Sequence, residues 1–123
     1  MDHSPRFLKL VEQTRARIRE TTIAEVQARK DSGAQFHLVD VREDHEWEAG
    51  HASGALHLGK GILERDVERA LPDLDADIVL YCGGGFRSAL AADALKTMGY
   101  RHVSSLAGGW KAWLAAGLPT SKE

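Results

Sequence analysis

The residue best suited to chemistry is the single cysteine, Cys82, which is followed by Gly83-Gly84-Gly85-Phe86-Arg87-Ser88. Three consecutive glycines let the backbone curl, because they lack the Cβ that disfavours positive φ angles. The amides of such a loop can converge on one point, and a helix that begins there adds its positive end. Arg87 contributes a permanent positive charge. The loop therefore favours a bound anion, and the thiolate of Cys82 is the anion that the sequence offers.

A lone cysteine is more often a small buried hydrophobe than a nucleophile, so this alternative must be weighed. The apolar run 77–81 predicts a buried strand directly before Cys82. The alanine-rich segment 87–98, closed by Gly99, predicts a helix directly after the loop. A glycine run and an Arg-Ser pair at a helix start are unusual surroundings for a structural cysteine. We therefore interpret Cys82 as a nucleophile.

Strands and helices alternate along the rest of the chain. Further strands are predicted at 36–41, 54–58 and 102–106, and further helices at 22–31, 43–49, 62–71 and 108–117. This alternation predicts an α/β fold, with a parallel sheet covered by helices on both faces. Ligands of such sheets bind beyond the carboxyl ends of the strands, and Cys82 is predicted at one of these ends.

Residues 6–20 predict one more helix, because Phe7, Val11, Thr14 and Ile18 recur at helical spacing. This apolar side could bind a partner or a second copy of the chain. It could also pack on its own domain, which is the more usual use of such a face. We interpret the basic residues of this segment as a solvated face.

The composition excludes several classes of function. A hydrophobic content of 43% and a charged content of 28% are typical of a soluble globular domain. The net charge of -2 gives no reason to expect a nucleic acid or an anionic membrane as partner. The apolar runs are too short to span a bilayer, and the first residues lack the apolar core of a signal peptide. One cysteine excludes an intramolecular disulfide and a cysteine-cluster zinc site, so we expect a reducing cytoplasm and no metal.

Four motifs follow one another along the chain: Asp40-Val41-Arg42, the segment 48–55 (EAGHASGA), the loop 82–88, and the segment 106–113 (LAGGWKAW) with Gly117-Leu118-Pro119 behind it. Together, and in this order, they resemble the rhodanese family of sulfurtransferases. The resemblance covers roughly residues 22–119 and implies a rhodanese-like fold, with a five-stranded, mainly parallel sheet and helices on both faces. The chain is accordingly divided into an N-terminal amphipathic helix (1–21), a rhodanese-like domain (22–119) and a C-terminal tail (120–123).

The resemblance also implies a reaction. The Cys82 thiolate would take the outer sulfur of thiosulfate or of a thiol persulfide and hold it as a cysteine persulfide. A thiophilic acceptor, such as cyanide in vitro or a small thiol or protein thiol in the cell, would then remove it. A covalent intermediate of this kind predicts ping-pong kinetics. No cofactor is implied, since sulfur is the atom carried, and we expect a monomer or a weak homodimer.

The roles of the site residues are carried over from the family by position. Cys82 and Arg87 take the catalytic roles, and Arg87 would stabilise the thiolate and the persulfide. The residues expected to bind the substrate around the transferred sulfur are Gly83, Gly84, Gly85, Phe86 and Ser88. The hydroxyl of Ser88 could contact the sulfur or could simply cap the helix.

Three further polar residues are expected to support the site rather than to react. Asp40 and Arg42 are interpreted as a buried pair that organises the neighbouring loops. His51 could act as a general base, but persulfide transfer needs little proton removal once the thiolate has formed. We therefore expect His51 to make a structural hydrogen bond.

The loop departs from the family pattern in one respect. Cytosolic thiosulfate enzymes of the family often carry basic residues directly after the cysteine, where this chain has Gly83 and Gly84. Arg87 is then the only cation of the loop. This departure disfavours thiosulfate, a dianion, and favours a less charged persulfide as donor.

Two other functions remain as alternatives. Cysteine phosphatases and arsenate reductases place five residues between the cysteine and the arginine, whereas four separate Cys82 from Arg87 here. The shorter loop suits a sulfur atom better than a tetrahedral oxyanion. The second alternative is a non-catalytic binding or sulfur-carrier module on the same fold, because a fold does not determine a function.

Overall fold

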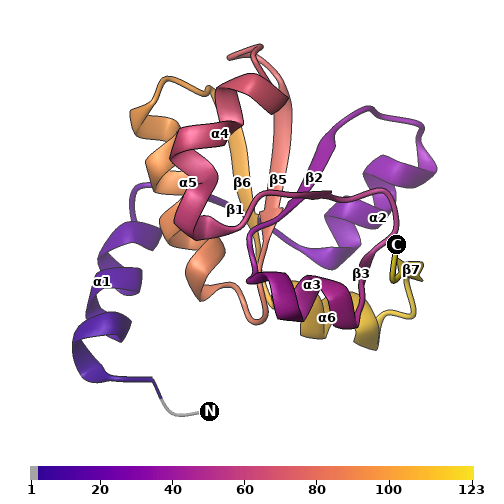
Figure 1. The fold of residues 1–123 in the computed structure, drawn as a ribbon, viewed down its shortest axis with the longest axis horizontal. Coiled ribbons are helices and arrows are strands. Elements are labelled where there is room, and N and C mark those ends of the chain that lie inside the picture. Colours follow the sequence, from indigo (N-terminus) through magenta and orange to yellow (C-terminus); the bar gives the residue numbers. More distant parts are fainter. Residues whose placement is uncertain (1–2) are drawn as a thin grey trace.

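A five-stranded sheet forms the centre of the fold (Figure 1). In the computed structural model, which describes residues 3–123, its strands lie in the order β1-β6-β5-β2-β4, and every neighbouring pair is parallel. The strands are β1 (Arg19–Thr21), β2 (His37–Asp40), β4 (Leu56–His57), β5 (Asp77–Tyr81) and β6 (His102–Leu106). The predicted fold class is thus confirmed.

Helices cover both faces of this sheet. They are α1 (Pro5–Arg15), α2 (Ile23–Asp31), α3 (Asp44–Ala49), the 3-10 helix η1 (Lys60–Ile62), α4 (Leu63–Ala70), α5 (Phe86–Thr97) and α6 (Gly109–Ala115). One core lies between the sheet and the helices α4 and α5, and a second lies between the sheet and the helices α2 and α6. Both faces of the sheet are therefore buried, as the continuous apolar runs of its strands require.

Strand β5 shows how the sequence divides its side chains between the two cores. Ile78 and Leu80 belong to the core beneath α4 and α5, whereas Val79 and Tyr81 belong to the core on the opposite face. This is the period of two that an extended strand imposes. Cys82 continues the first series and lies in the first core. The alternation thus directs the thiol toward the face on which α5 begins.

The N-terminal helix is shorter than predicted. It ends at Arg15, and residues 19–21 form β1 at the edge of the sheet, paired with Ser104–Leu106 of β6. The helical prediction to residue 20 was wrong because the edge of β6 offers this segment backbone hydrogen bonds that local periodicity does not reveal. Val11 and Thr14 are buried, so α1 packs on its own domain.

A second, two-stranded sheet was missed altogether. Strand β3 (His51–Ala52) pairs with β7 (Thr120–Ser121) in an antiparallel register. The predicted C-terminal tail at 120–123 is therefore partly a strand. Strands of two residues carry no usable sequence period, because alternation needs at least four positions to be recognised. Among the helices of residues 3–123, none is both long and apolar enough to cross a membrane.

Candidate active site

The sulfur of Cys82 receives two backbone N–H groups. Cys82 directly follows β5 and is only 1% exposed. The N–H groups of Gly85 and Ser88 donate to its Sγ at 3.2 and 3.3 Å. Both donors belong to the start of α5, where backbone N–H groups have no partner inside the helix. The site therefore stabilises negative charge on the sulfur through fixed dipoles.

The start of α6 holds the other side of the same loop. The N–H of Trp110 donates to the carbonyl of Cys82 at 2.7 Å, and that of Lys111 donates to the carbonyl of Gly83 at 3.2 Å. A Cβ on Gly109 would overlap the Cys82 carbonyl oxygen, so this close approach requires glycine. The carbonyls of Cys82 and Gly83 thus point toward α6, whereas the N–H groups of Gly85 and Ser88 point toward the sulfur.

Ser88 contacts the sulfur and does not cap the helix. Its Oγ lies 3.5 Å from Cys82 Sγ and 2.8 Å from the Oγ of Ser105 in β6. The N-cap of α5 is Gly85, which has a φ of 100° that glycine adopts without strain. Of the two alternatives left open for Ser88, the geometry therefore favours contact with the sulfur.

The guanidinium of Arg87 is not free, because Glu46 of α3 binds it through two hydrogen bonds. Nη1 donates to Oε2 at 2.7 Å and Nη2 donates to Oε1 at 3.1 Å. This bidentate pair lowers the pKa of Glu46 to about 2 and raises that of Arg87. A Coulombic interaction with Cys82 makes a smaller contribution to the raised pKa of Arg87. The only cation of the loop is thus largely neutralised by the carboxylate of Glu46, which sequence reasoning did not select.

A pocket of about 550 Å³ opens above the loop. Its lining residues are His3, Phe7, Glu43, His45, Glu46, Cys82, Gly83, Gly84, Phe86, Arg87 and Lys111. Five of the ten predicted site residues line this cavity: Cys82, Gly83, Gly84, Phe86 and Arg87. Gly85 and Ser88 hold the sulfur beneath it. Sequence reasoning missed the contributions from α1 and α3, which lie far from Cys82 along the chain.

Asp40 and Arg42 form a buried ion pair beside this pocket. Arg42 Nη2 lies 2.8 Å from Asp40 Oδ2, and the Arg42 backbone N–H donates to Oδ1 at 2.8 Å. Nη2 also donates to the carbonyl of Gly50 at 2.7 Å, and the guanidinium lies 4.7 Å from the ring of Trp110. Burial lowers the pKa of Arg42, but the hydrogen bonds and charge of Asp40 offset this, so the net direction is upward. The pair thus joins the α3–β3 connection to the beginning of α6.

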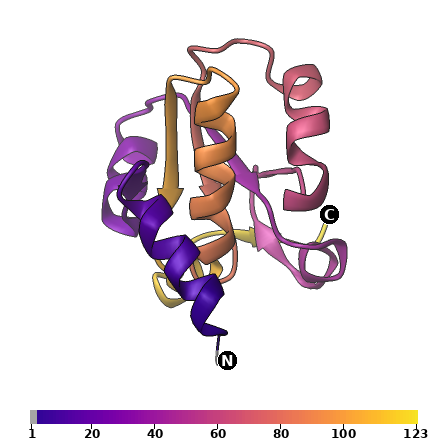
Figure 2. The same ribbon diagram turned by 90° about the vertical axis from the view of Figure 1, so that its left-hand side faces the viewer.

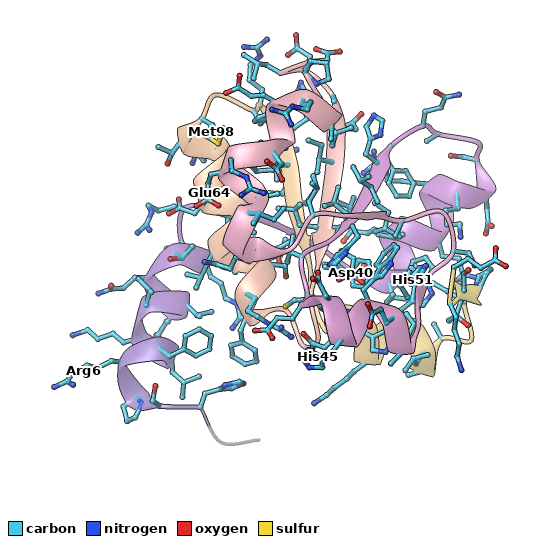
Figure 3. All side chains as sticks on the ribbon, in the orientation of Figure 1. Arg6, Asp40, His45, His51, Glu64 and Met98 are labelled. Atoms are coloured by element: carbon cyan, nitrogen blue, oxygen red, sulfur yellow. The ribbon has the colours of Figure 1, made fainter. Side chains whose placement is uncertain are left out.

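His51 is held in a stack of three rings outside the lining of the pocket. Its ring lies parallel to that of Trp47 at 3.3 Å, and His57 stacks on Trp47 at 4.7 Å. Nδ1 of His51 donates to the carbonyl of Trp47 at 2.9 Å, which fixes the tautomer because a carbonyl only accepts. In Figure 3 His51 and Asp40 both lie near α3, whereas Arg6 points away from the domain. Within residues 3–123 no three metal-binding side chains come together.

Comparison with known proteins agrees with this geometry. The family model described as the rhodanese-like domain matches residues 22–116. The thiosulfate sulfurtransferase GlpE of Vibrio cholerae is 35% identical over 85 residues, which are 69% of this chain and 78% of GlpE. The probable adenylyltransferase/sulfurtransferase MoeZ of Mycobacterium tuberculosis is 39% identical over 83 residues, 68% of this chain. That match covers only 21% of the length of MoeZ.

A solved structure extends the similarity to the N-terminal helix. A protein of Rhodopseudomonas palustris, described as of unknown function and a possible tyrosine phosphatase, superposes with a TM-score of 0.86 at 30% identity. The superposition covers 98% of this chain and 99% of the other. The cysteine loop, the parallel sheet and the matched family model lead to one conclusion: this chain belongs to the rhodanese-like family.

Proposed function

We propose that this chain is a sulfurtransferase that carries a sulfane sulfur as a persulfide on Cys82. The proposal depends above all on the position of Sγ, which accepts the N–H groups of Gly85 and Ser88 and adjoins an open pocket. Such a position favours a thiolate and, after transfer, the inner sulfur of a persulfide. The relatives named as sulfurtransferases support the same reaction class.

In the first half-reaction the thiolate attacks the outer sulfur of the donor. A new S–S bond forms, and the bond between that sulfur and the rest of the donor breaks. The leaving group departs with the electron pair, as sulfite from thiosulfate or as a thiolate from a persulfide. In the second half-reaction an acceptor thiolate or cyanide attacks the outer sulfur and releases the Cys82 thiolate. The charges balance in both steps, and no external oxidant or reductant takes part.

The acceptor must come from outside the chain. Enzymes that discharge a persulfide internally use a second thiol that closes a disulfide, and this sequence has one cysteine. The persulfide should therefore persist until an external nucleophile arrives. The expected acceptors remain a small thiol or a protein thiol, and the expected location remains a reducing cytoplasm.

Mass spectrometry of the intact protein tests the proposal. After treatment with benzenethiosulfonate and removal of the excess, the wild-type chain should gain one sulfur, and cyanide should restore the original mass. Cys82→Ser and Cys82→Ala should gain none while keeping the circular dichroism of the wild type. An unmodified wild-type chain, or transfer by the Cys82 variants, would contradict the carrier mechanism.

Phosphate-ester hydrolysis is the second candidate, favoured by the similarity to the R. palustris protein described as a possible tyrosine phosphatase. The loop disfavours phosphate-ester hydrolysis, because only four residues separate Cys82 from Arg87 and because the Arg87 guanidinium is paired with Glu46. An aryl phosphate offered to the same preparation separates the two functions. Turnover of the phosphate that is lost in Cys82→Ser, without sulfur transfer, would reverse the order of the two candidates.

A further inference from the structure

Helix α1 lies outside the residues matched by the family model, yet it reaches the pocket above Cys82. It packs along α5, with Val11 and Thr14 buried beneath it. Beyond its end, Arg17 forms an ion pair with Asp93 of α5 at 3.0 Å. Figure 2 shows α1 alongside α5, with its N-terminal end on the side of the sheet where the strands end. The beginning of α1 is therefore held at the entrance of the site.

Two rings from this segment extend the aromatic surface of the cysteine loop. The ring centroid of Phe86 lies 4.5 Å from that of His3 and 6.2 Å from that of Phe7. His3 and Phe7 are themselves 5.2 Å apart, and the guanidinium of Arg15 lies 5.0 Å from the centre of the Phe86 ring. All three rings are partly exposed and line the same pocket. Together they form what we call the aromatic wall, defined as His3, Phe7 and Phe86.

The charged side chains of the pocket cancel one another. Glu43 and Glu46 bring two negative charges, and Arg87 and Lys111 bring two positive charges. A small dianion such as thiosulfate therefore meets no excess of positive charge. The pocket volume of about 550 Å³ lies within the range of about 300–1,000 Å³ that is usual for organic ligands. An organic donor could fill this volume and contact the aromatic wall, whereas thiosulfate has no carbon to place there.

We propose that α1 supplies a specificity-determining wall, through which the site prefers sulfane-sulfur donors that carry an apolar or aromatic organic group. This inference rests on the proposed function and adds the class of donor. His3 and Phe7 contact the organic group of the donor and leave the reacting atoms to Cys82. With an aryl thiosulfonate, the thiolate takes the outer sulfur, the S–S bond breaks, and the aryl sulfinate leaves with the electron pair.

Steady-state kinetics with two donors test the wall. Benzenethiosulfonate carries a ring and one negative charge, whereas thiosulfate carries two charges and no ring. Phe7→Ala should raise KM for benzenethiosulfonate roughly fivefold to tenfold, as expected for the loss of one aromatic contact, and leave kcat unchanged. For thiosulfate, KM and kcat of Phe7→Ala should stay within about twofold of the wild type, because the N–H groups of Gly85 and Ser88 at the sulfur are unchanged. Leu8→Ala is the matched control, since Leu8 follows on the same helix and is 41% exposed.

His3→Ala removes a second ring of the wall and leaves Val11 and Thr14, the buried residues of α1, in place. It should raise KM for benzenethiosulfonate by a smaller factor than Phe7→Ala does.

A direct binding measurement is independent of turnover. Benzenesulfonate has the ring but no sulfane sulfur to transfer. In an NMR titration, Phe7→Ala should bind benzenesulfonate more weakly than the wild type does, whereas Leu8→Ala should bind it as tightly as the wild type. Equal changes for both donors, or unchanged benzenesulfonate binding in Phe7→Ala, would overturn the inference. Benzenesulfonate binding that depends on Phe7, in a chain that never gains sulfur, would keep the wall and refute the proposed function.

Discussion

Two carboxylate–arginine pairs flank the Cys82 loop, and they differ in burial. The side chains of Asp40 and Arg42 are 0% and 4% exposed. Those of Glu46 and Arg87 are 25% and 33% exposed and line the pocket. Their shortest N–O distances are nearly equal, at 2.8 and 2.7 Å. Distance alone therefore does not distinguish two pairs whose surroundings give them different tasks.

The difference in burial indicates what each pair can do. Removing one partner of a buried pair leaves the other partner charged and desolvated, so the Asp40–Arg42 pair is a fixed part of the structure. Arg42 contacts both the connection before β3 and the start of α6, and the pair therefore links these two segments. A half-exposed pair is screened by water and can exchange partners at a modest cost. Glu46 and Arg87 therefore set the charge that a donor meets at the pocket. The buried pair maintains the geometry of the site, and the half-exposed pair adjusts its electrostatics.

The largest expected effect is on stability, from breaking the buried pair. Asp40→Asn should lower the free energy of unfolding by about 3–5 kcal/mol, because it leaves Arg42 buried with its charge uncompensated. Glu46→Gln, which breaks the half-exposed pair, should cost about 1 kcal/mol or less. Urea denaturation followed by circular dichroism measures both. Similar losses in the two variants would remove the distinction between the pairs.

A smaller effect should appear in catalysis when the half-exposed pair is broken. Glu46→Gln should raise kcat/KM for thiosulfate roughly fivefold, or about 1 kcal/mol, because Arg87 no longer faces a carboxylate. Glutamine keeps an oxygen that can accept the N–H of Glu43, which Glu46 now accepts at 2.9 Å at the start of α3.

Glu43→Gln is the control for this variant. Glu43 lines the same pocket, but the Arg87 guanidinium makes its hydrogen bonds with Glu46 and not with Glu43. Glu43→Gln should therefore raise kcat/KM for thiosulfate by a smaller factor than Glu46→Gln does. An unchanged value in Glu46→Gln would show that the neutralisation of Arg87 does not limit the reaction.

A third prediction adds a cation instead of freeing one. Gly84→Lys should lower KM for thiosulfate by roughly threefold, in the range of an exposed charge contact. The backbone accepts a side chain there, because a Cβ on Gly84 would meet only the Phe86 ring, at 3.7 Å. A Cβ on Gly83 would come within 3.1 Å of Arg87 Nη2, so Gly83 is the poorer position. Gly84→Gln supplies similar bulk without charge, and an equal gain in that variant would contradict the electrostatic explanation.

The smallest predicted effect is on the stability of the folded chain at acidic pH. The pKa of Glu46 is about 2 in the folded chain and near its ordinary value of 4.5 in the unfolded chain. The pair therefore contributes stability above pH 4.5, and this contribution is lost as the pH falls toward 2. The difference in urea midpoint between wild type and Glu46→Gln should shrink between pH 5 and pH 2.5. A constant difference over that range would mean that the carboxylate of Glu46 does not titrate there.

The sequence predicted those features that depend on neighbouring residues. The strand before Cys82, the glycine loop and the helix behind it form one continuous segment, so their order already located the thiol at a strand end. The helix predicted at 22–31 begins after Thr22, whose hydroxyl accepts the N–H of Glu25 at 3.2 Å.

Features that join distant segments were beyond the sequence. Glu46 and Arg87 are 41 positions apart, and the polar residues of α3 gave no sign of which would meet the loop. Strand β1 forms only because β6 offers a free edge, and residues 19–21 have no alternation of their own. His3 and Phe7 reach Phe86 because α1 packs on α5. Periodicity indicated that α1 had an apolar side, but not where that side would lie.

The hydroxyl pair behind the sulfur has a consequence for proton positions. Ser88 Oγ lies between Cys82 Sγ and Ser105 Oγ, and it has a single hydrogen to donate. A neutral thiol donates to Ser88, which then donates to Ser105. A thiolate must instead receive the Ser88 hydrogen, and Ser105 turns its own hydrogen toward Ser88. The two hydroxyl rotors thus reverse together when Cys82 ionises, and no heavy atom has to move. The chain can alternate between its protonated and its sulfur-accepting form by reorienting two hydrogens inside an unchanged frame.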